Sequence, residues 1–186
     1  IFTGWYLDKK LIRDEITNYG SLRAPYLRFV IFILRYFAPV AIAKRLLPKM
    51  VARGGGKMAV TTSIAGRFGF PLRCGYSSSK FALYGFFETL QAEYYDAGIR
   101  VTIVCPGRVY TNISKYALDK GGKPHGVMDP GQAGGMSAEK AAKIITKAIA
   151  NNRREVLVGR KELLMVYIKR FFPGLCAHLA RKIKPM

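Results

Sequence analysis

The chain of 186 residues has little acid, little cysteine and little histidine. Its 11 Asp and Glu stand against 31 Lys and Arg, which gives a formal net charge of +20. The few cysteines form no Cys-x-x-Cys pair and the histidines are far apart in the sequence; these residues are Cys74, Cys105, Cys176, His125 and His178. A disulfide framework, a zinc site and a histidine-based catalytic site are therefore not expected. We predict reduced thiols and no bound metal.

Long hydrophobic runs are absent as well. The longest apolar stretch, residues 29–43, is interrupted by Arg35 and bounded by Arg28 and Lys44, so it does not predict a membrane-spanning helix. The sequence also has no initiating Met and no signal-peptide pattern, which favours an interior fragment or an incomplete gene model. Hydrophobic residues make up 50% of the chain, and this excludes a disordered chain despite the net charge.

The excess positive charge is spread evenly along the chain. It amounts to +7 over residues 1–53, +6 over residues 54–150 and +7 over residues 151–186. A DNA-reading element usually concentrates its basic residues in one patch, so specific nucleic-acid binding is disfavoured. A basic surface that faces phosphates or lipid head groups is favoured, and a peripheral membrane or nucleic-acid binder is kept as one functional alternative.

Hydrophobic periodicity predicts alternating helices and strands in a single domain over residues 1–186. The expected order is helix 25–53, strand 57–63, helix 76–95, strand 99–105, helix 137–151 with Ser137 as its N-cap, and strand 155–159. Residues 1–34 give no clear assignment, residues 111–135 are expected to form a long loop, and residues 161–186 a basic amphipathic tail broken at Pro173-Gly174. The alternation predicts an α/β domain with a parallel sheet, whose functional site lies beyond the carboxyl ends of the strands.

The residues that carry chemistry are a tyrosine, a lysine and a serine. Tyr76 and Lys80 lie four residues apart and therefore share one face of the predicted helix. A tyrosine with a pKa near ~10 is a poor base at neutral pH, but a neighbouring cation favours the phenolate and permits proton exchange with an alcohol or carbonyl oxygen. Ser63, at the end of the preceding strand, would hydrogen-bond the same oxygen. Each piece alone is more often a surface pair or a cap, so the prediction depends on their joint spacing.

This arrangement resembles the short-chain dehydrogenase/reductase family. The resemblance is carried by Thr62-Ser63-Ile64-Ala65-Gly66, by Tyr76-Ser77-Ser78-Ser79-Lys80 and by residues 106–112, and it covers residues 35–158. Within the family, the chain is most similar to the membrane-associated member 7 type, because of residues 36–41, residues 126–129 and the basic tail with Phe172-Pro173-Gly174. The resemblance implies a Rossmann-like, doubly wound parallel sheet truncated at the N-terminus, with the carboxyl-terminal half of the family's domain present.

The resemblance also implies residue roles. Ser63, Tyr76 and Lys80 would be the catalytic residues: Tyr76 as general acid/base, Lys80 assisting it and binding the nicotinamide ribose, and Ser63 positioning the substrate oxygen. Cofactor contacts are expected from Tyr76, Lys80, Pro106, Gly107, Val109 and Thr111, and the expected cofactor is NADP, with NAD as the alternative. The chain would be an NAD(P)-dependent oxidoreductase that interconverts an alcohol and a carbonyl on a lipid-like or steroid-like small molecule.

Partners and location follow from the same resemblance and from the missing half. We expect a homo-oligomer, because half a sheet leaves a strand edge unpaired and apolar surface uncovered, with Phe29, Ile31, Phe32 and Phe37 as candidates. Residues 161–186 would either close over the substrate site or contact a membrane peripherally. The member 7 resemblance implies association with the endoplasmic reticulum membrane, on its cytoplasmic or lumenal side, and the cytoplasm is the alternative.

The sequence departs from the family in two places. It has no TGxxxGxG turn to hold a pyrophosphate, since only Gly4 and Gly20 precede Gly54, and it has no Asn-Asn-Ala-Gly element. Arg35 stands near the position of the family's structural asparagine, where its charge would repel Lys80. These departures support an alternative function: a catalytically silent, truncated remnant or isoform with a binding or membrane-associated role.

Overall fold

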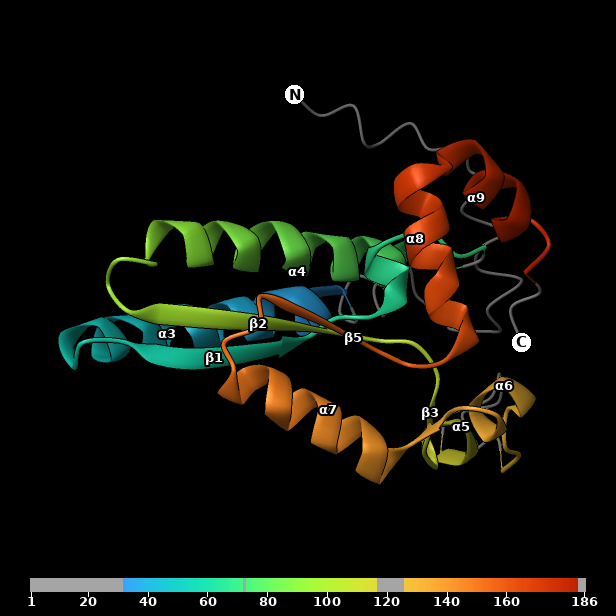
Figure 1. Ribbon diagram of the computed structural model, residues 1–186, viewed down its shortest axis with the longest axis horizontal. Helices are drawn as coiled ribbons and strands as arrows, with labels where there is room; N and C mark the ends of the chain where they lie inside the picture. Colours follow the sequence, from blue (N-terminus) through green and yellow to red (C-terminus); the bar gives the residue numbers. More distant parts are fainter. Residues whose placement is uncertain (1–31, 72, 117–125, 184–186) are drawn as a thin grey trace.

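A three-stranded parallel sheet forms the centre of the computed structural model, which describes residues 32–71, 73–116 and 126–183 (Figure 1). Strand β1 (Gly56–Thr61) pairs with β2 (Ile99–Pro106), and β2 pairs with β5 (Glu155–Val158), so the strand order is β1-β2-β5. Because all pairings are parallel, the three strands end at the same edge of the molecule. The predicted α/β sheet is confirmed.

Both faces of this sheet are buried, as is usual for parallel sheets. Along β2, Val101, Ile103 and Cys105 face one cluster of core residues, and Val104 faces the other. These four side chains are at most 3% exposed. Burial on both sides explains why the strand is a nearly continuous apolar run in the sequence instead of an alternation of apolar and polar residues.

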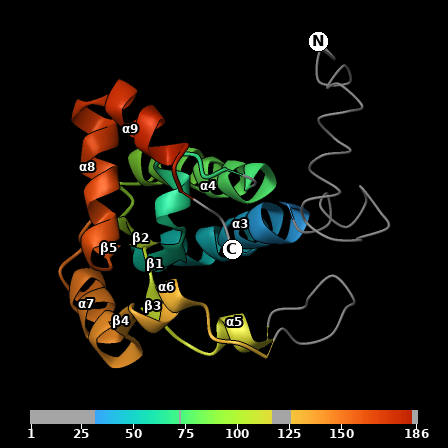
Figure 2. The same cartoon turned by 90° about the vertical axis from the view of Figure 1, so that its right-hand side faces the viewer.

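Two helices cover one face of the sheet and a third covers the other (Figures 1 and 2). Helix α3 (Ala38–Ala52), which follows a π-helical turn η2 (Ile33–Phe37), lies with α4 (Cys74–Glu93) on one face, and α7 (Ala138–Ala150) lies on the other. The hydroxyl of Ser137 accepts a hydrogen bond from the Lys140 backbone N–H at 3.3 Å. Ser137 is therefore the N-cap of α7, as predicted.

Two glycine turns touch each other at the amino ends of β1 and β2. Gly55 has a φ of +127° and Gly98 a φ of +78°, a backbone region that favours glycine. A Cβ atom on Gly55 would lie 2.5 Å from the carbonyl oxygen of Gly98, and one on Gly98 would lie 2.5 Å from that of Gly54. The two turns therefore pack backbone against backbone, and no side chain fits between them.

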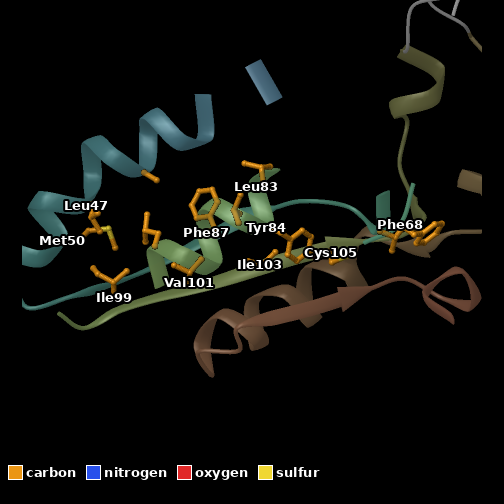
Figure 3. Packing of buried hydrophobic residues seen from close by; sticks show 14 of the residues in the cluster. Leu47, Met50, Phe68, Leu83, Tyr84, Phe87, Ile99, Val101, Ile103 and Cys105 are labelled. Atoms are coloured by element: carbon orange, nitrogen blue, oxygen red, sulfur yellow. The ribbon is translucent and has the colours of Figure 1, made fainter. Parts of the chain in front are cut away.

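The larger part of the core lies between the sheet and the helices α3 and α4 (Figure 3). Leu47 comes from α3, Leu83 and Phe87 come from α4, and they pack with Ile99 and Val101 of β2. Leu83 and Ile99 are 0% exposed. This layer fixes α4 on the sheet, and α4 is the helix that carries the predicted tyrosine and lysine.

Several short elements gather at the edge where the strands end (Figure 1). They are the 3-10 turns η3 (Ile64–Gly66) and η4 (Lys161–Leu163), the strands β3 (Val109–Tyr110) and β4 (Met136–Ser137), and the helices α5 (Ile113–Tyr116), α6 (Pro130–Ala133), α8 (Leu164–Phe171) and α9 (Pro173–Ala180). Strands β3 and β4 form a second, two-stranded parallel sheet. The break of the tail between α8 and α9 falls at Phe172, next to the predicted Pro173-Gly174.

The sequence prediction was wrong in detail at two places. The segment 111–135 contains the short helices α5 and α6, and α6 begins because the Asp129 carboxylate caps the backbone N–H groups of Gly131 and Gln132. Strand β1 ends at Thr61 and not at Ser63, since Ser63 caps η3. The predicted helix 25–53 is described only from residue 32 onward; the rest of it, with Phe29 and Ile31, lies outside the described residues.

The described part of the chain contains neither a helix that could span a membrane nor a cluster of metal ligands. None of its helices combines the length and the apolarity needed to cross a bilayer. Among the same residues, no three His, Cys, Asp or Glu side chains come together as metal ligands. His125 lies outside the described residues.

A matched pair of leucines tests this packing. Leu83→Ala should lower the free energy of unfolding by about 2–5 kcal/mol, because Leu83 is 0% exposed and its removal leaves a cavity. Leu46→Ala on the outer face of α3, where Leu46 is 48% exposed, should change it by less than ~0.5 kcal/mol. Urea denaturation followed by circular dichroism measures both, and equal losses would contradict the placement of α4.

Candidate active site

Ser63 lies directly beyond β1, in an extended conformation with a φ of −172°. Its hydroxyl oxygen accepts a hydrogen bond from the Ala65 backbone N–H at 3.2 Å, so Ser63 caps the turn η3. A hydroxyl that accepts this bond still has its O–H to donate. The capping role therefore leaves Ser63 able to bind a substrate oxygen.

Tyr76 and Lys80 lie one turn apart near the start of α4, as their spacing predicted. The ammonium nitrogen of Lys80 is 5.8 Å from the centre of the Tyr76 ring. The same nitrogen donates a hydrogen bond to the carbonyl oxygen of Thr61 at 3.0 Å. Lys80 thus reaches from α4 to the last residue of β1, and two of its three N–H donors are not used by this bond.

The turn η3 holds the Ser63 segment against α4. A Cβ atom on Gly66 would lie 3.0 Å from the backbone of Lys80 and 3.0 Å from the ring of Tyr84, so glycine permits this close approach. The structure therefore brings the Ser63 segment next to Lys80. Among the described residues, no hydrogen bond joins the hydroxyls of Ser63 and Tyr76.

A second cation lies at the tyrosine. The guanidinium carbon of Arg35, on the π-helical turn η2, is 4.9 Å from the centre of the Tyr76 ring. Burial lowers the pKa of the Lys80 ammonium, and the positive charge of Arg35 lowers the same pKa further. The repulsion that the sequence predicted between Arg35 and Lys80 is therefore present.

The residues expected around a nicotinamide lie on the turn after β2. Pro106 ends β2, and the Gly107 backbone N–H donates to the Val158 carbonyl at 2.7 Å. Val109 lies in β3, half-buried. The Thr111 hydroxyl donates to the side-chain oxygen of Gln132 at 3.3 Å.

Glu162 holds this turn in place, and sequence reasoning missed it. Its carboxylate accepts hydrogen bonds from the backbone N–H groups of Arg108 at 2.7 Å and Arg160 at 3.1 Å. A Cβ atom on Gly107 would collide with the Glu162 side chain. Glu162 comes 54 residues after Arg108, so no local sequence signal joins them.

A nicotinamide dinucleotide fits these residues at one end only. Lys80 has two donors that its bond to Thr61 does not use, and a ribose hydroxyl would accept them at the end of β1, whereas the space beside Gly107 is filled by the Glu162 side chain. A pyrophosphate is usually held by a glycine-rich turn that opens a helix, and the sequence has no TGxxxGxG motif. The described residues therefore suit the ribose next to the nicotinamide, not the pyrophosphate.

A polar network behind the site was also missed by sequence reasoning. The Arg67 guanidinium pairs with the Glu155 carboxylate at 2.6 Å and lies 3.8 Å from the centre of the Tyr84 ring. The Tyr84 hydroxyl donates to the same carboxylate at 2.7 Å. Arg67 and Glu155 are 88 residues apart in the sequence, and only the fold brings them together.

The network shifts the protonation of its members. Burial raises the pKa of the Cys105 thiol to about 11 and also raises the pKa of the Tyr84 hydroxyl. For Arg67, burial lowers the pKa of the guanidinium, but the interactions with Glu155 and Tyr84 together raise it by more, so the pKa is raised. Cys105 is therefore a protonated core thiol at neutral pH, which agrees with the reduced thiol expected from the sequence.

Comparison with known proteins gives concordant results. A family model described as short chain dehydrogenase matches residues 31–121. The chain is 38% identical over 143 residues to mouse Dehydrogenase/reductase SDR family member 7B, and this alignment covers 76% of the chain and 44% of the mouse protein. A solved short-chain dehydrogenase from Burkholderia cenocepacia, in complex with NADP, matches with a TM-score of 0.69 at 22% identity, covering 87% of this chain and 61% of that one. Another from Burkholderia phymatum, in complex with NAD, matches with a TM-score of 0.66 at 20% identity, covering 84% and 62%.

The chain belongs to the short-chain dehydrogenase/reductase family of oxidoreductases, as its motifs implied. Its sheet and helices are part of the Rossmann fold of that family. The particular relatives are of the member 7 type, as predicted, and the chain spans 44% of the length of the mouse one.

The charge of Arg35 can be tested through the reactivity of Lys80. Arg35→Gln removes one of the two causes that lower the Lys80 pKa, so that pKa should rise and Lys80 should react more slowly with an acetylating reagent at a fixed pH near ~9. Mass spectrometry of the acetylated peptide measures the rate across a pH series. Lys49→Gln, which removes an exposed cation of α3, is the control and should leave the rate unchanged. An unchanged rate in Arg35→Gln would contradict the geometry.

Proposed function

We propose that the protein is an NAD(P)-dependent oxidoreductase that interconverts an alcohol and a carbonyl, with Tyr76 as its general acid/base. The observation that carries the proposal is the position of Lys80, whose ammonium lies beside the Tyr76 ring while it is hydrogen-bonded to the Thr61 carbonyl at the end of β1. Functional sites of open parallel sheets lie at this edge.

Each residue of the set has a separate role in the proposed reaction. In reduction, the Tyr76 hydroxyl donates a proton to the carbonyl oxygen; in oxidation, the phenolate accepts the proton of the alcohol. The positive charges of Lys80 and Arg35 lie beside the Tyr76 ring. The Ser63 hydroxyl donates a hydrogen bond to the substrate oxygen and stabilises its developing charge. A bound nicotinamide supplies or accepts the hydride at carbon.

The cofactor would be held by Lys80 at the ribose and by Pro106, Gly107, Val109 and Thr111 around the nicotinamide. We favour NADP and keep NAD as the alternative. A nicotinamide dinucleotide of either kind is supported by the two solved structures described above, one a complex with NADP and the other with NAD. The substrate would be a lipid-like or steroid-like small molecule. In support, exposed apolar side chains lie on the helices beyond the strand ends, among them Leu164 on α8 and Leu175 on α9.

The catalytic role of Tyr76 can be tested in a chimera that joins the aligned N-terminal portion of the mouse relative to residues 32–186. The chimera should reduce steroid or lipid ketones with NADPH, measured by the loss of absorbance at the NADPH wavelength. Tyr76→Phe should lower turnover by about 10²- to 10⁴-fold, the usual contribution of a general acid/base. Tyr95→Phe, an exposed tyrosine beyond the other end of α4, should have no effect. Full turnover in Tyr76→Phe would refute the assignment.

A second candidate function is that of a catalytically silent remnant or isoform with a binding or membrane-associated role. It is favoured by the two departures from the family, namely the absence of a TGxxxGxG turn from the 186 residues and the Arg35 cation beside Tyr76. NADPH titration of the 186-residue chain, followed by nucleotide fluorescence, separates the two. Saturable binding at micromolar concentration supports the oxidoreductase, whereas no binding up to millimolar concentration supports the silent form.

We also propose a homo-oligomer. In the described part of the chain, β1 pairs only with β2, so its outer edge is open. Large apolar side chains on the neighbouring helices are exposed, namely Leu34, Phe37, Ile42 and Leu46 on η2 and α3 and Phe81 on α4. Such a surface is typical of a contact between protein subunits.

A peripheral contact with a membrane is proposed for α8 and the start of α9. Leu164, Tyr167 and Phe171 follow helical spacing along one face of α8, and they are between 53% and 69% exposed. Exposed cations lie before, within and after this segment in the sequence, namely Lys161, Lys169, Arg170, Arg181 and Lys182. An exposed apolar face with flanking cations suits the surface of an anionic bilayer. The proposed location is the endoplasmic reticulum membrane, on its cytoplasmic or lumenal side, and the cytoplasm is the alternative.

Sedimentation with anionic liposomes tests this contact. Phe171→Ser combined with Phe172→Ser should reduce the fraction of chain that pellets with phosphatidylserine vesicles, because two exposed aromatic side chains are lost from the face. Tyr116→Ser on α5, an equally exposed aromatic residue, is the control and should pellet like the unaltered chain. Equal pelleting of all three proteins would remove the idea.

A further inference from the structure

A basic groove runs along the open edge of the sheet, away from the candidate active site. It has a volume of about 930 Å³ and lies between α7, β5 and α8, which Figure 2 shows side by side at one edge of the molecule. Its charged lining consists of Arg67, Lys147, Arg153, Lys169, Arg170 and a single carboxylate, Glu155. Ser63, Tyr76 and Lys80 do not line it.

The only carboxylate in the groove lining, Glu155, already has partners. Glu155 pairs with Arg67 at 2.6 Å and accepts the Tyr84 hydroxyl at 2.7 Å. Among the residues that the structure describes, Lys147, Lys169 and the two other arginines of the groove have no acidic partner within salt-bridge distance. Four positive charges therefore face one concave space without neutralisation.

The carbonyl groups at the end of α7 do not supply the missing negative charge. A helix carries partial negative charge at its carboxyl end, which lies beside the groove at Ala148 and Asn151. The Lys57 ammonium, from β1, donates to the carbonyl oxygens of Ala150 at 2.8 Å and Ile149 at 3.4 Å. These two carbonyls are thereby satisfied from outside the groove.

Most of the remaining lining is apolar. Ile144 from α7, Val156 and Leu157 from β5 and Val166 from α8 form an apolar wall, and Ala148, Asn151 and Tyr167 complete the lining. An inorganic ion would use only the cations. A molecule with an anionic head and a hydrocarbon portion would use both parts of the lining, since apolar burial adds to the charge attraction.

We propose that this groove binds a phosphate-bearing amphiphile, with its phosphate on the cations of α7, α8 and the turn before β5 and its hydrocarbon portion against the apolar wall. Guanidinium groups bind phosphate through two parallel hydrogen bonds, and lysines add point charges. Two arginines without acidic partners, Arg153 and Arg170, supply the first kind of contact, and Lys147 and Lys169 supply the second. The phosphate would be the head group of a lipid, and a free phosphate compound is the alternative that the test distinguishes.

The same charges disfavour a second copy of the chain at this edge. Strand β5 ends the sheet in the order of the described strands, so its outer backbone groups are open to pairing. Lysine and arginine beside an open strand oppose pairing with an identical strand, because like charges would be brought together. The groove is therefore assigned to a small anionic molecule.

Calorimetric titration of the 186-residue chain tests the proposal with three probes: monomeric dihexanoyl phosphatidic acid, dihexanoyl phosphatidylcholine and inorganic phosphate. The phosphatidic acid should bind most tightly, and its binding should weaken as salt is added. Lys147→Glu combined with Arg170→Glu should weaken this binding at least about tenfold. Lys140→Glu combined with Lys143→Glu makes the same change of charge on residues of α7 outside the groove, and it should leave binding unchanged.

Each other outcome counts against the proposal. If inorganic phosphate binds as tightly as the lipid, the apolar wall contributes nothing to binding. The ligand would then be a free phosphate compound and not an amphiphile. Equal losses in both double variants would show attraction to overall charge and overturn the site, as would no binding of any probe. If the groove variant does not fold, Lys147→Gln combined with Lys169→Gln replaces it with a smaller change of charge.

Discussion

The hydrogen bond from the Lys80 ammonium to the Thr61 carbonyl is the interaction on which the candidate site depends. It ties the helix that carries Tyr76 to the end of the strand that leads into Ser63. A cation that loses part of its water needs a partner, and here the partner is a backbone oxygen, not a carboxylate. The ammonium is thereby held beside the ring of Tyr76.

A second set of charges serves the sheet itself. Arg67 follows η3 and reaches Glu155 on the edge strand, with the Tyr84 hydroxyl on the same carboxylate. This arrangement joins the segment after Ser63 to α4 and to β5 at once. Glu155 is also the only carboxylate in the lining of the basic groove. Because it is paired with Arg67, it does not neutralise the other cations of the groove.

Much of this was predictable from the sequence because it is local. The apolar run of β2, the N-cap Ser137 and the four-residue spacing of Tyr76 and Lys80 are all signals within one element, and each was confirmed as structure. The contacts of Glu162 with the turn after β2 and of Arg67 with Glu155 were missed, since they join residues more than fifty positions apart. Helices α5 and α6 were missed because glycine and proline dominate their neighbourhood, and a single capping aspartate decides where α6 begins.

The touching glycine turns at the amino ends of β1 and β2 have a consequence for how such a domain changes over time. Where main chain presses on main chain, every substitution adds atoms to a space that is already full. The end of the sheet where β1 and β2 begin therefore tolerates few substitutions. New ligand preferences have to arise at the carboxyl ends of the strands, among the short helices that follow them. There, side chains can be exchanged without moving the sheet.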